Sequence, residues 1–252
     1  MTRAADRVPG VFRVHASLLI VALAASIARG DVTTTLSGSS LVVIGDTSSD
    51  SVSIEGVADG VTVAGLEGTL VNDSSQAVTV SGVEKLTVKL GDGADRLRLM
   101  HLTLPHGLVV RLGRGNDSVE LDQVSTGTAS IRSGYGNDAV FIYGPSTFDL
   151  LSVQTSRGND LVVVSGVWVR GNLGVDTGSD SDEVNIVATR VGGNLYVHLG
   201  NDDDFAVLQD ITVYGDTDLD GGNGDDVLVF AGYVWFGDDP DIDGFGDNWW
   251  WW

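Results

Sequence analysis

One spacing constrains the fold of this 252-residue chain more than any other feature of its sequence. A glycine-rich turn such as Gly113-Arg114-Gly115-Asn116-Asp117 ends in an aspartate that recurs at intervals of 22, 21, 22, 22, 22 and 22 residues. The aspartates of this column are Asp95, Asp117, Asp138, Asp160, Asp182, Asp204 and Asp226. A period this strict indicates one structural unit per repeat, with each unit stacked on its neighbours.

Apolar residues alternate with polar ones on both sides of each aspartate, which predicts two strands per repeat. Val119 and Leu121 exemplify the strand after the turn, and Leu108 and Val110 the strand before it. A weaker apolar pair completes each repeat, giving about three short strands and three turns per 22 residues. We therefore expect an all-β chain that forms a right-handed parallel β-helix, or solenoid. A two-sided solenoid is the alternative, but it needs longer strands than the glycines permit.

The strand before each turn also carries a polar column between its apolar positions, and this column is expected to face water. Its members change in character along the chain. They are Lys89, Arg111, Arg132, Gln154, Asp176, His198 and Asp220.

The chain divides into four predicted parts. Residues 1–28 have the features of a signal peptide, with arginines before an apolar run that is too short to span a bilayer; a buried N-terminal helix is the alternative. Residues 29–82 form an irregular N-terminal cap, in which Asp50 and Asp73 keep the spacing without the glycines. The β-helix repeats occupy residues 83–232, and residues 233–252 form an acidic tail that ends in tryptophans.

The charge balance excludes some partners. The formal net charge is −21, because 35 acidic residues face 14 lysines and arginines, so nucleic acid is not expected to bind. An apolar content of 42% at regular positions can still bury a core, so the acid is assigned to a solvated or cation-loaded surface. The absence of cysteine excludes disulfides and thiolate metal sites. No segment after the signal peptide is long and apolar enough to be a membrane anchor.

Stacking places one turn carboxylate above the next, about 5 Å away, where two charges repel by about 1 kcal/mol in water. Something must offset this repulsion at every step. Backbone amides of the turn can do so, as aspartate and asparagine commonly stabilise turns. Protonation could also do so, since like charges raise a carboxyl pKa, but the turns are expected to be exposed, so that solvent keeps these groups ionised. A divalent cation between rungs is the third solution, and Ca²⁺ suits it because Ca²⁺ accepts six to eight oxygen ligands in loose geometry.

The segment Gly113–Val119 resembles the second to eighth positions of the repeat-in-toxin nonapeptide, Gly-Gly-x-Gly-x-Asp-x-apolar-x. The full pattern resembles secreted bacterial β-helix proteins that bear such turns. The resemblance implies extracellular Ca²⁺ held by turn carbonyls and by Asp95, Asp117, Asp138, Asp160 and Asp226. Asp182 and Asp204 are also assigned as ligands, although Asp180 and Asp202 replace the second glycine of their turns. The repeat of this chain is 22 residues rather than nine, so at most one edge would bind calcium in that manner.

A second calcium signal lies in the tail. Its acidic residues follow the spacing of the loops of EF-hand, dockerin and thrombospondin type 3 domains, with Gly244 at the sixth position. A bidentate glutamate is missing, since Trp250 stands at the twelfth position, and a solvated acidic turn is the alternative. The predicted ligands are Asp239, Asp241, Asp243 and Asp247.

The sequence therefore predicts a secreted or cell-surface, calcium-binding β-solenoid that acts as a structural or adhesive module without catalytic activity. Its expected partners are Ca²⁺ and components of the extracellular surface, such as glycans. The alternative is a β-helix that binds or cleaves polysaccharides. Cleavage is disfavoured because the rungs have almost no insertions and the histidines share no motif.

Overall fold

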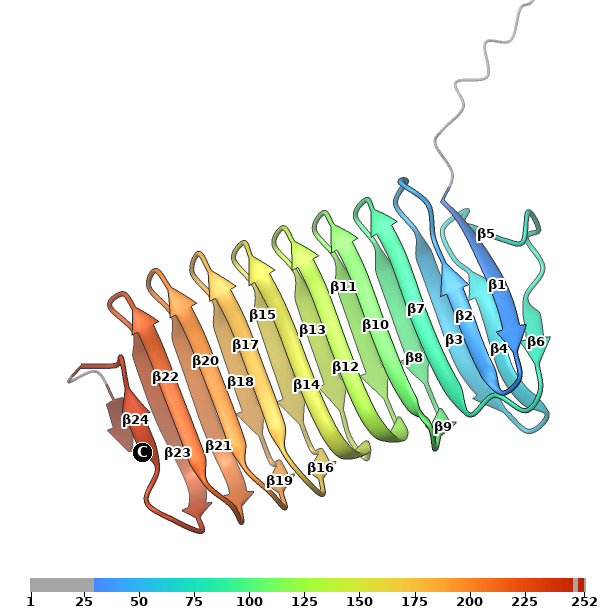
Figure 1. Ribbon diagram of the computed structural model, residues 1–252. Coiled ribbons are helices and arrows are strands. Elements are labelled where there is room, and N and C mark those ends of the chain that lie inside the picture. The colour runs from blue at the N-terminus through green and yellow to red at the C-terminus, as the bar shows by residue number, and fades with distance from the viewer. Residues whose placement is uncertain (1–29, 247–248, 252) are drawn as a thin grey trace, which may run out of the picture.

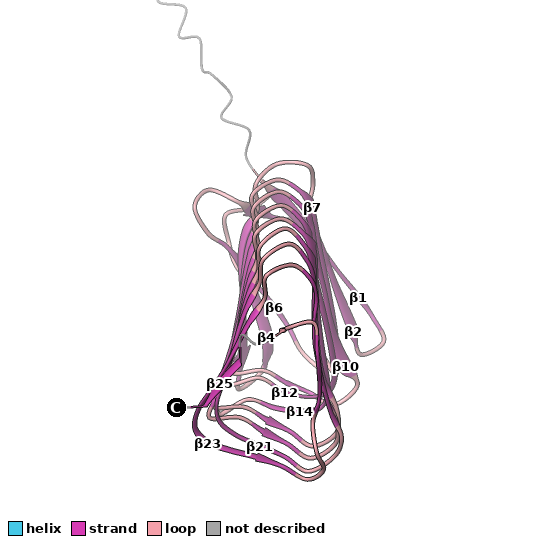
Figure 2. Ribbon diagram, turned by 90° about the vertical axis from the view of Figure 1, so that its left-hand side faces the viewer, coloured by secondary structure: helices cyan, strands magenta, loops and turns pink. Residues whose placement is uncertain are grey.

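The computed structural model describes residues 30–246 and 249–251, and in these residues the chain is a parallel β-solenoid without helices (Figure 1). Successive rungs stack along one axis and form a flattened solenoid. Viewed along the solenoid axis, each rung is tall and narrow, with a tight turn at one end and a broader one at the other (Figure 2). The solenoid fold predicted from the spacing of the aspartates is confirmed.

The strand that precedes each glycine turn forms one broad face, which we call face A. Its strands pair in parallel, each with its equivalent in the next rung. They are β7 (Lys85–Asp92), β10 (Gly107–Arg114), β12 (Ser125–Tyr135), β14 (Thr147–Arg157), β17 (Leu173–Ser179), β20 (Leu195–Asn201) and β22 (Thr217–Asn223).

The strand that follows each turn forms the opposite face, which we call face B, and it also pairs in parallel. Its strands are β8 (Arg96–Met100), β11 (Ser118–Asp122), β13 (Ala139–Tyr143), β15 (Leu161–Ser165), β18 (Glu183–Val187), β21 (Phe205–Val213) and β23 (Val227–Phe236). The third side is short. In three rungs it is a separate strand, namely β9 (Thr103–Leu104), β16 (Trp168–Val169) or β19 (Arg190–Val191).

The core lies between the two broad faces and is built by the alternating residues that the sequence identified. Val110, Ile131 and Val153 stack in register on face A, and Val119, Val140 and Val162 do so on face B. All six are fully buried. Each rung thus buries the same columns as the rung before it, which is why the repeat is so regular.

The N-terminal cap interrupts the parallel stacking. Strand β2 pairs in parallel with β7, and β3 pairs in parallel with β8, so these two strands make the first rung. Antiparallel partners cover their outer sides, β1 on β2 and β4 on β3. The cap strands are β1 (Asp31–Ser37), β2 (Ser40–Ile44), β3 (Ser51–Val57), β4 (Gly60–Gly65), β5 (Leu70–Val71) and β6 (Val78–Val80).

This cap explains why the spacing of Asp50 and Asp73 misleads. Val52 pairs with Leu97, so the rung of Asp50 lies directly on the rung of Asp95 although 45 residues separate them. The chain between them leaves the solenoid as β4, β5 and β6. Asp73 is exposed on this excursion, so its spacing does not mark a repeat position.

The tail continues the solenoid. Strand β24 (Asp241–Asp243) pairs in parallel with β22, and β25 (Trp249–Trp251) pairs in parallel with β23. Phe245 between them is buried. The segment predicted to be a calcium loop is therefore part of one more rung.

The predicted signal peptide lies outside the described residues. Within the described ranges, no helix has the length and apolar character needed to cross a membrane.

Candidate functional site: the aspartate column

The aspartate column lies inside the solenoid, at the narrow end of every rung. Its side chains are between 1% and 3% exposed, and Asp50 of the cap rung joins them at 1%. The expectation that the turns expose these carboxylates to solvent is wrong. The seven predicted residues are brought into one line, and Asp50 is the member that the sequence analysis left out of the site.

Each carboxylate is held by the backbone of the rung before it. The amide N–H of Asp117 donates to Oδ1 of Asp138 at 2.8 Å, and the amide N–H of Asp138 donates to Oδ1 of Asp160 at 2.7 Å. The same bond links every consecutive pair from Asp50 to Asp226, at 2.7 to 2.9 Å. The column is thus a continuous ladder of side chain–backbone hydrogen bonds along the solenoid axis.

The second carboxylate oxygen of each rung faces inward. A Cβ placed on Gly221 would lie 2.8 Å from Oδ2 of Asp226, so this oxygen points at the residue five positions earlier in the chain. From Asp95 to Asp226, Oδ2 is buried without a hydrogen-bond partner among the described residues. The residues five positions before the other aspartates, from Asp95 to Asp204, are Leu90, Leu112, Ser133, Thr155, Thr177 and Leu199.

The three hydroxyl residues do not fully satisfy these oxygens. The hydroxyls of Thr155 and Thr177 lie beside Asp160 and Asp182 and lower their pKa. Their protons, however, go to the backbone carbonyls of Thr177 and Leu199 at 3.0 and 2.8 Å. At the leucine rungs the residue five positions earlier has no side-chain hydroxyl to offer this oxygen.

Burial raises the pKa of every carboxyl in the column, because the charged form loses its hydration. The pKa rises to about 7 for Asp95, Asp117, Asp182 and Asp204. The bond from the backbone amide acts in the opposite direction and limits the rise. A proton on Oδ2 would remove both the buried charge and the repulsion between rungs, so near neutral pH the ladder holds protons that ordinary aspartates have lost.

A calcium ion fits the column less well than a proton does. Each rung contributes one unpartnered carboxylate oxygen, whereas Ca²⁺ takes six to eight oxygen ligands. At Leu90, Leu112 and Leu199 no side-chain oxygen adds to it. Throughout the described residues, no group of three or more His, Cys, Asp or Glu side chains converges as a metal site.

The outer surface of the turns has a second, exposed ladder made by asparagine. Oδ1 of Asn116 accepts from the amide of Asn137, and Oδ1 of Asn137 accepts from the amide of Asn159, both at 3.0 Å. Farther along, Asp180 and Asp202 replace the second turn glycine and adopt φ of 75° and 74°. The acidic character of this edge therefore increases toward the C-terminal rungs.

The tail ligands do not converge. Asp241 and Asp243 are both exposed, in register with Asp218 and Asp220 of the previous rung, and Asp239 is exposed before them. Asp247 lies outside the described residues. A strand extends Asp241 and Asp243 along one face, whereas a calcium loop coils its ligands around one point. The three described residues therefore do not form such a loop by themselves, and calcium binding in the tail stays a prediction.

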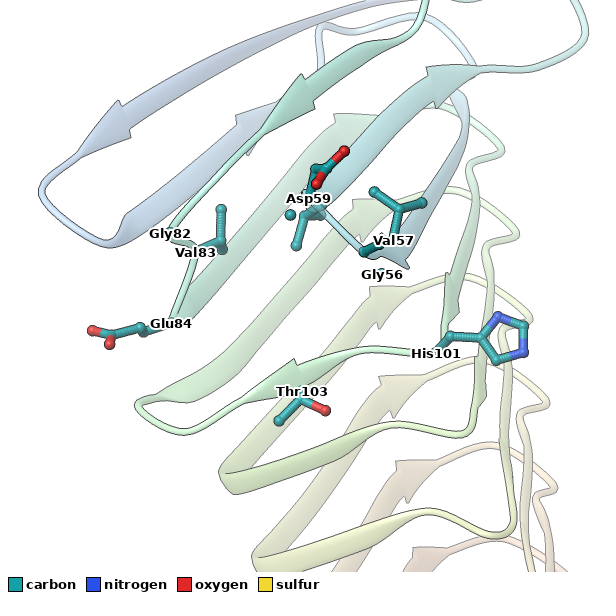
Figure 3. A pocket seen from close by; sticks show the side chains of 11 residues that line it. Gly56, Val57, Asp59, Gly82, Val83, Glu84, His101 and Thr103 are labelled. Carbon is teal, nitrogen blue, oxygen red and sulfur yellow. The ribbon is translucent and has the colours of Figure 1, made fainter.

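A shallow hollow of about 480 Å³ lies beside the N-terminal cap, where the β3–β4 hairpin meets the first rungs (Figure 3). Its size is within the range of small-molecule sites. Asp59, Glu84, His101 and Thr103 line it, and Figure 3 shows Glu84 and His101 on opposite sides. His101 lies 3.3 Å from Glu55 of the cap. Sequence reasoning assigned this histidine no role because it belongs to no motif, and its neighbour comes from a distant part of the chain.

Comparison of the chain with protein-family models, with curated proteins and with solved structures finds no match.

Proposed function

We propose that the chain is a non-catalytic structural or adhesive module, exported from the cell, whose β-solenoid presents flat side-chain arrays to its surroundings. One observation carries this proposal. The rungs from Asp95 to Asp226 are uniform and unbroken, with an inner hydrogen-bond ladder through every turn and no long loop over either broad face. Such a rod is stiff and offers extended surfaces rather than a closed site. Export rests on the N-terminal sequence alone.

Adhesion is tested by binding of the purified mature chain to immobilised acidic and neutral polysaccharides and to cell-envelope fractions. The expected result is saturable binding without release of new sugar ends. If the chain binds none of these surfaces, the adhesive role is refuted and the structural role remains. Rapid release of oligosaccharides would refute the claim that the chain is not catalytic.

The second candidate is a β-helix that binds or cleaves polysaccharides, favoured by the hollow beside the cap. Asp59, Glu84 and His101 could contribute acid–base groups there. The test is release of reducing or unsaturated sugar ends from acidic polysaccharides. Activity that is lost in Asp59→Asn and in His101→Ala, with unchanged thermal unfolding, would establish this candidate; activity that is equal in all variants would assign it to a contaminant.

Calcium stabilisation stays a prediction, supported by the unpartnered Oδ2 atoms and opposed by the small ligand set. Thermal unfolding of the mature chain is compared in millimolar Ca²⁺ and in chelator, at pH 5 and at pH 8. If protons satisfy the ladder, the midpoint is higher at pH 5 and insensitive to Ca²⁺ at both pH values. A rise of the midpoint with Ca²⁺ at pH 8, abolished by Asp160→Asn, would instead establish the cation.

A further inference from the structure

The outward side chains of face A change sign at its centre. In register from one rung to the next, one outward column passes through Gln154 on β14. Strands β7, β10 and β12 carry cations in this column, the rungs after β14 carry carboxylates and one histidine, and the cap strand β2 adds Ile44 beyond Lys89. The column reads Lys89, Arg111, Arg132, Gln154, Asp176, His198 and Asp220.

The cations of this column are not neutralised within the chain. Among the described residues, the side chains of Lys89 and Arg111 have neither a hydrogen bond nor an ion pair, and the side chain of Arg132 bonds only to the neutral Gln154 and Ser130. This is unexpected in a chain with 35 acidic and 14 basic residues. All seven side chains of the column lie at least partly in solvent. His198 lies between two aspartates and 3.4 Å from Asp218. The three cations, by contrast, have only like or neutral neighbours in the column and are available to a partner.

The neighbouring outward column of face A has small residues at the rungs where the charge changes sign. Its three central residues are Ser130, Ser152 and Gly174, in register on consecutive strands. Gly174 has no backbone requirement for glycine, since a Cβ there would meet nothing within 4 Å and its φ is not positive. A glycine inside a strand costs stability and often marks the close approach of another backbone. The centre of face A therefore has room for another sheet.

We propose that face A binds face A of a second copy of this chain, with the two solenoid axes antiparallel and a two-fold axis running along β14. This operation places each rung before β14 against the equivalent rung after it. Arg132 meets Asp176, Arg111 meets His198, and Lys89 meets Asp220, and each contact occurs twice, as an isologous interface requires. In the neighbouring column Ser130 meets Gly174, and Ser152 meets its own symmetry mate.

The size of the face is compatible with a dimer. Seven strands at about 4.8 Å span about 30 Å, and five residues at about 3.3 Å span about 17 Å. The two copies would then bury about 1,000 Å² in total, which lies near the lower limit for a specific interface. Opposite charges face each other at the contacts of Arg132 with Asp176 and of Lys89 with Asp220, although each chain is strongly acidic; Arg111 meets a histidine, which supplies no negative charge. The dimer is therefore expected to be reversible, with its register set by the charges.

A linear polyanion on the cationic half is the competing occupant. It would account for Lys89, Arg111 and Arg132. It would not account for the matching order of acidic residues beyond Gln154 or for the small residues at the centre. A self-complementary face explains all three features together, so we assign the second copy.

The test uses charge reversal in the mature chain, with mass measured by sedimentation or light scattering. Arg132→Asp places carboxylates opposite each other at both symmetry-related contacts, and Asp176→Arg places two guanidinium groups there. Each variant alone should dissociate at least about tenfold more readily than the wild type. An equimolar mixture of the two should dimerise again, because both contacts in the mixed dimer join opposite charges. The double variant should also dimerise.

Two further variants separate binding from folding. Arg170→Asp makes the same charge change off face A and should leave the dimer intact, while Gly174→Leu fills the open space and should give a folded monomer. Circular dichroism and thermal unfolding verify the fold of every variant. The proposal is overturned by a wild-type chain that is monomeric at high micromolar concentration, or by a mixture that does not restore the dimer. Monomeric wild type that binds polygalacturonate through Arg132 would assign the cationic half to a polyanion.

Discussion

At the scale of single residues, the aspartates of the column have two chemically distinct oxygens. Oδ1 accepts a backbone N–H, and Oδ2 faces the interior without a partner among the described residues. An asparagine keeps an oxygen that can accept the backbone N–H but has no ionisable oxygen. An alanine has neither. The two roles can therefore be separated by substitution at one position.

Asp160→Ala should destabilise the chain by about 1–3 kcal/mol more than Asp160→Asn, since alanine leaves the buried amide of Asp138 without an acceptor. Asparagine retains the acceptor and removes the ionisable oxygen, so at pH 8 it should match or exceed the wild type. Urea unfolding measures both. Asp92→Asn, at an exposed position, is the control, and equal losses for alanine and asparagine would contradict the ladder.

The turn glycines are required by both conformation and space. Gly115 has φ of 130°, and a Cβ there would overlap the carbonyl oxygen of Gly93 in the rung before. Gly115→Ala should therefore cost more than about 3 kcal/mol, whereas Gly174→Ala should change the stability of the monomer by less than about 0.5 kcal/mol. Chemical denaturation of the two variants checks the difference; a mild effect at Gly115 would show that the turn can widen.

The direction of the aspartate side chains was beyond the reach of the sequence pattern. In the strands, alternation assigns Val119 inward and Glu120 outward, and both assignments hold. Gly113 and Gly115 break that alternation at the turn, because a backbone at positive φ can aim the next side chain to either side. A sequence signal does exist, since buried residue types such as Leu112 and Thr155 stand five positions before each aspartate.

At the scale of the rung, register is specified by columns that are nearly the same throughout the solenoid. Removal of residues 139–160 joins Asp138 to Leu161, which reproduces the junction between Asp160 and Leu161. The shortened chain should fold with one rung fewer, because repeats interact chiefly with their nearest neighbours. The slope of its unfolding free energy against urea concentration should fall in proportion to the surface that one rung exposes on unfolding.

A matched deletion of residues 139–149 provides the control, because half a rung would set apolar columns against turns. This variant should not show a cooperative unfolding transition. Cooperative unfolding of both variants would contradict a register fixed by the columns.

The rung length and the two faces could be predicted because every rung repeats them. An irregular cap was predicted over residues 29–82, but its antiparallel strands could not be, since β4 and β6 leave the solenoid and obey no period. The strand in the tail was not predicted for a related reason. Asp241 and Asp243 satisfy the spacing of a calcium loop, but Ile242 between them pairs with Leu219 and continues a column.

At the scale of the whole molecule, the column makes stability depend on pH. The pKa is raised for all of its carboxyls, from 3.8 ordinarily to about 6 for Asp50 and Asp160 and to about 7 for Asp95, Asp117, Asp182 and Asp204. The folded state therefore holds more protons between about pH 4 and pH 7. In this window the free energy of unfolding should fall as pH rises, by about 1.4 kcal/mol per pH unit for each retained proton, and these groups should add no further change outside it.

Unfolding by urea from pH 4 to pH 8 measures this slope. Repetition at high salt screens the repulsion among exposed acids and leaves the buried groups as the main source of the remaining slope. Replacement of Asp117, Asp138 and Asp160 by asparagine should reduce the slope of the unfolding free energy against pH. A stability that increases with pH across this range would refute protonation of the ladder.

The antiparallel cap has a consequence for the order in which the chain acquires structure. Hairpins β1–β2 and β3–β4 contain mostly local contacts, which form faster than pairings between distant segments. Once they are in place, the Asp50 rung offers a finished edge to the segment that follows, and every later rung needs only the one before it. Folding can thus proceed from the N-terminal end in steps of one rung, at the pace at which the chain emerges from a ribosome or an export channel, without waiting for its C-terminal residues.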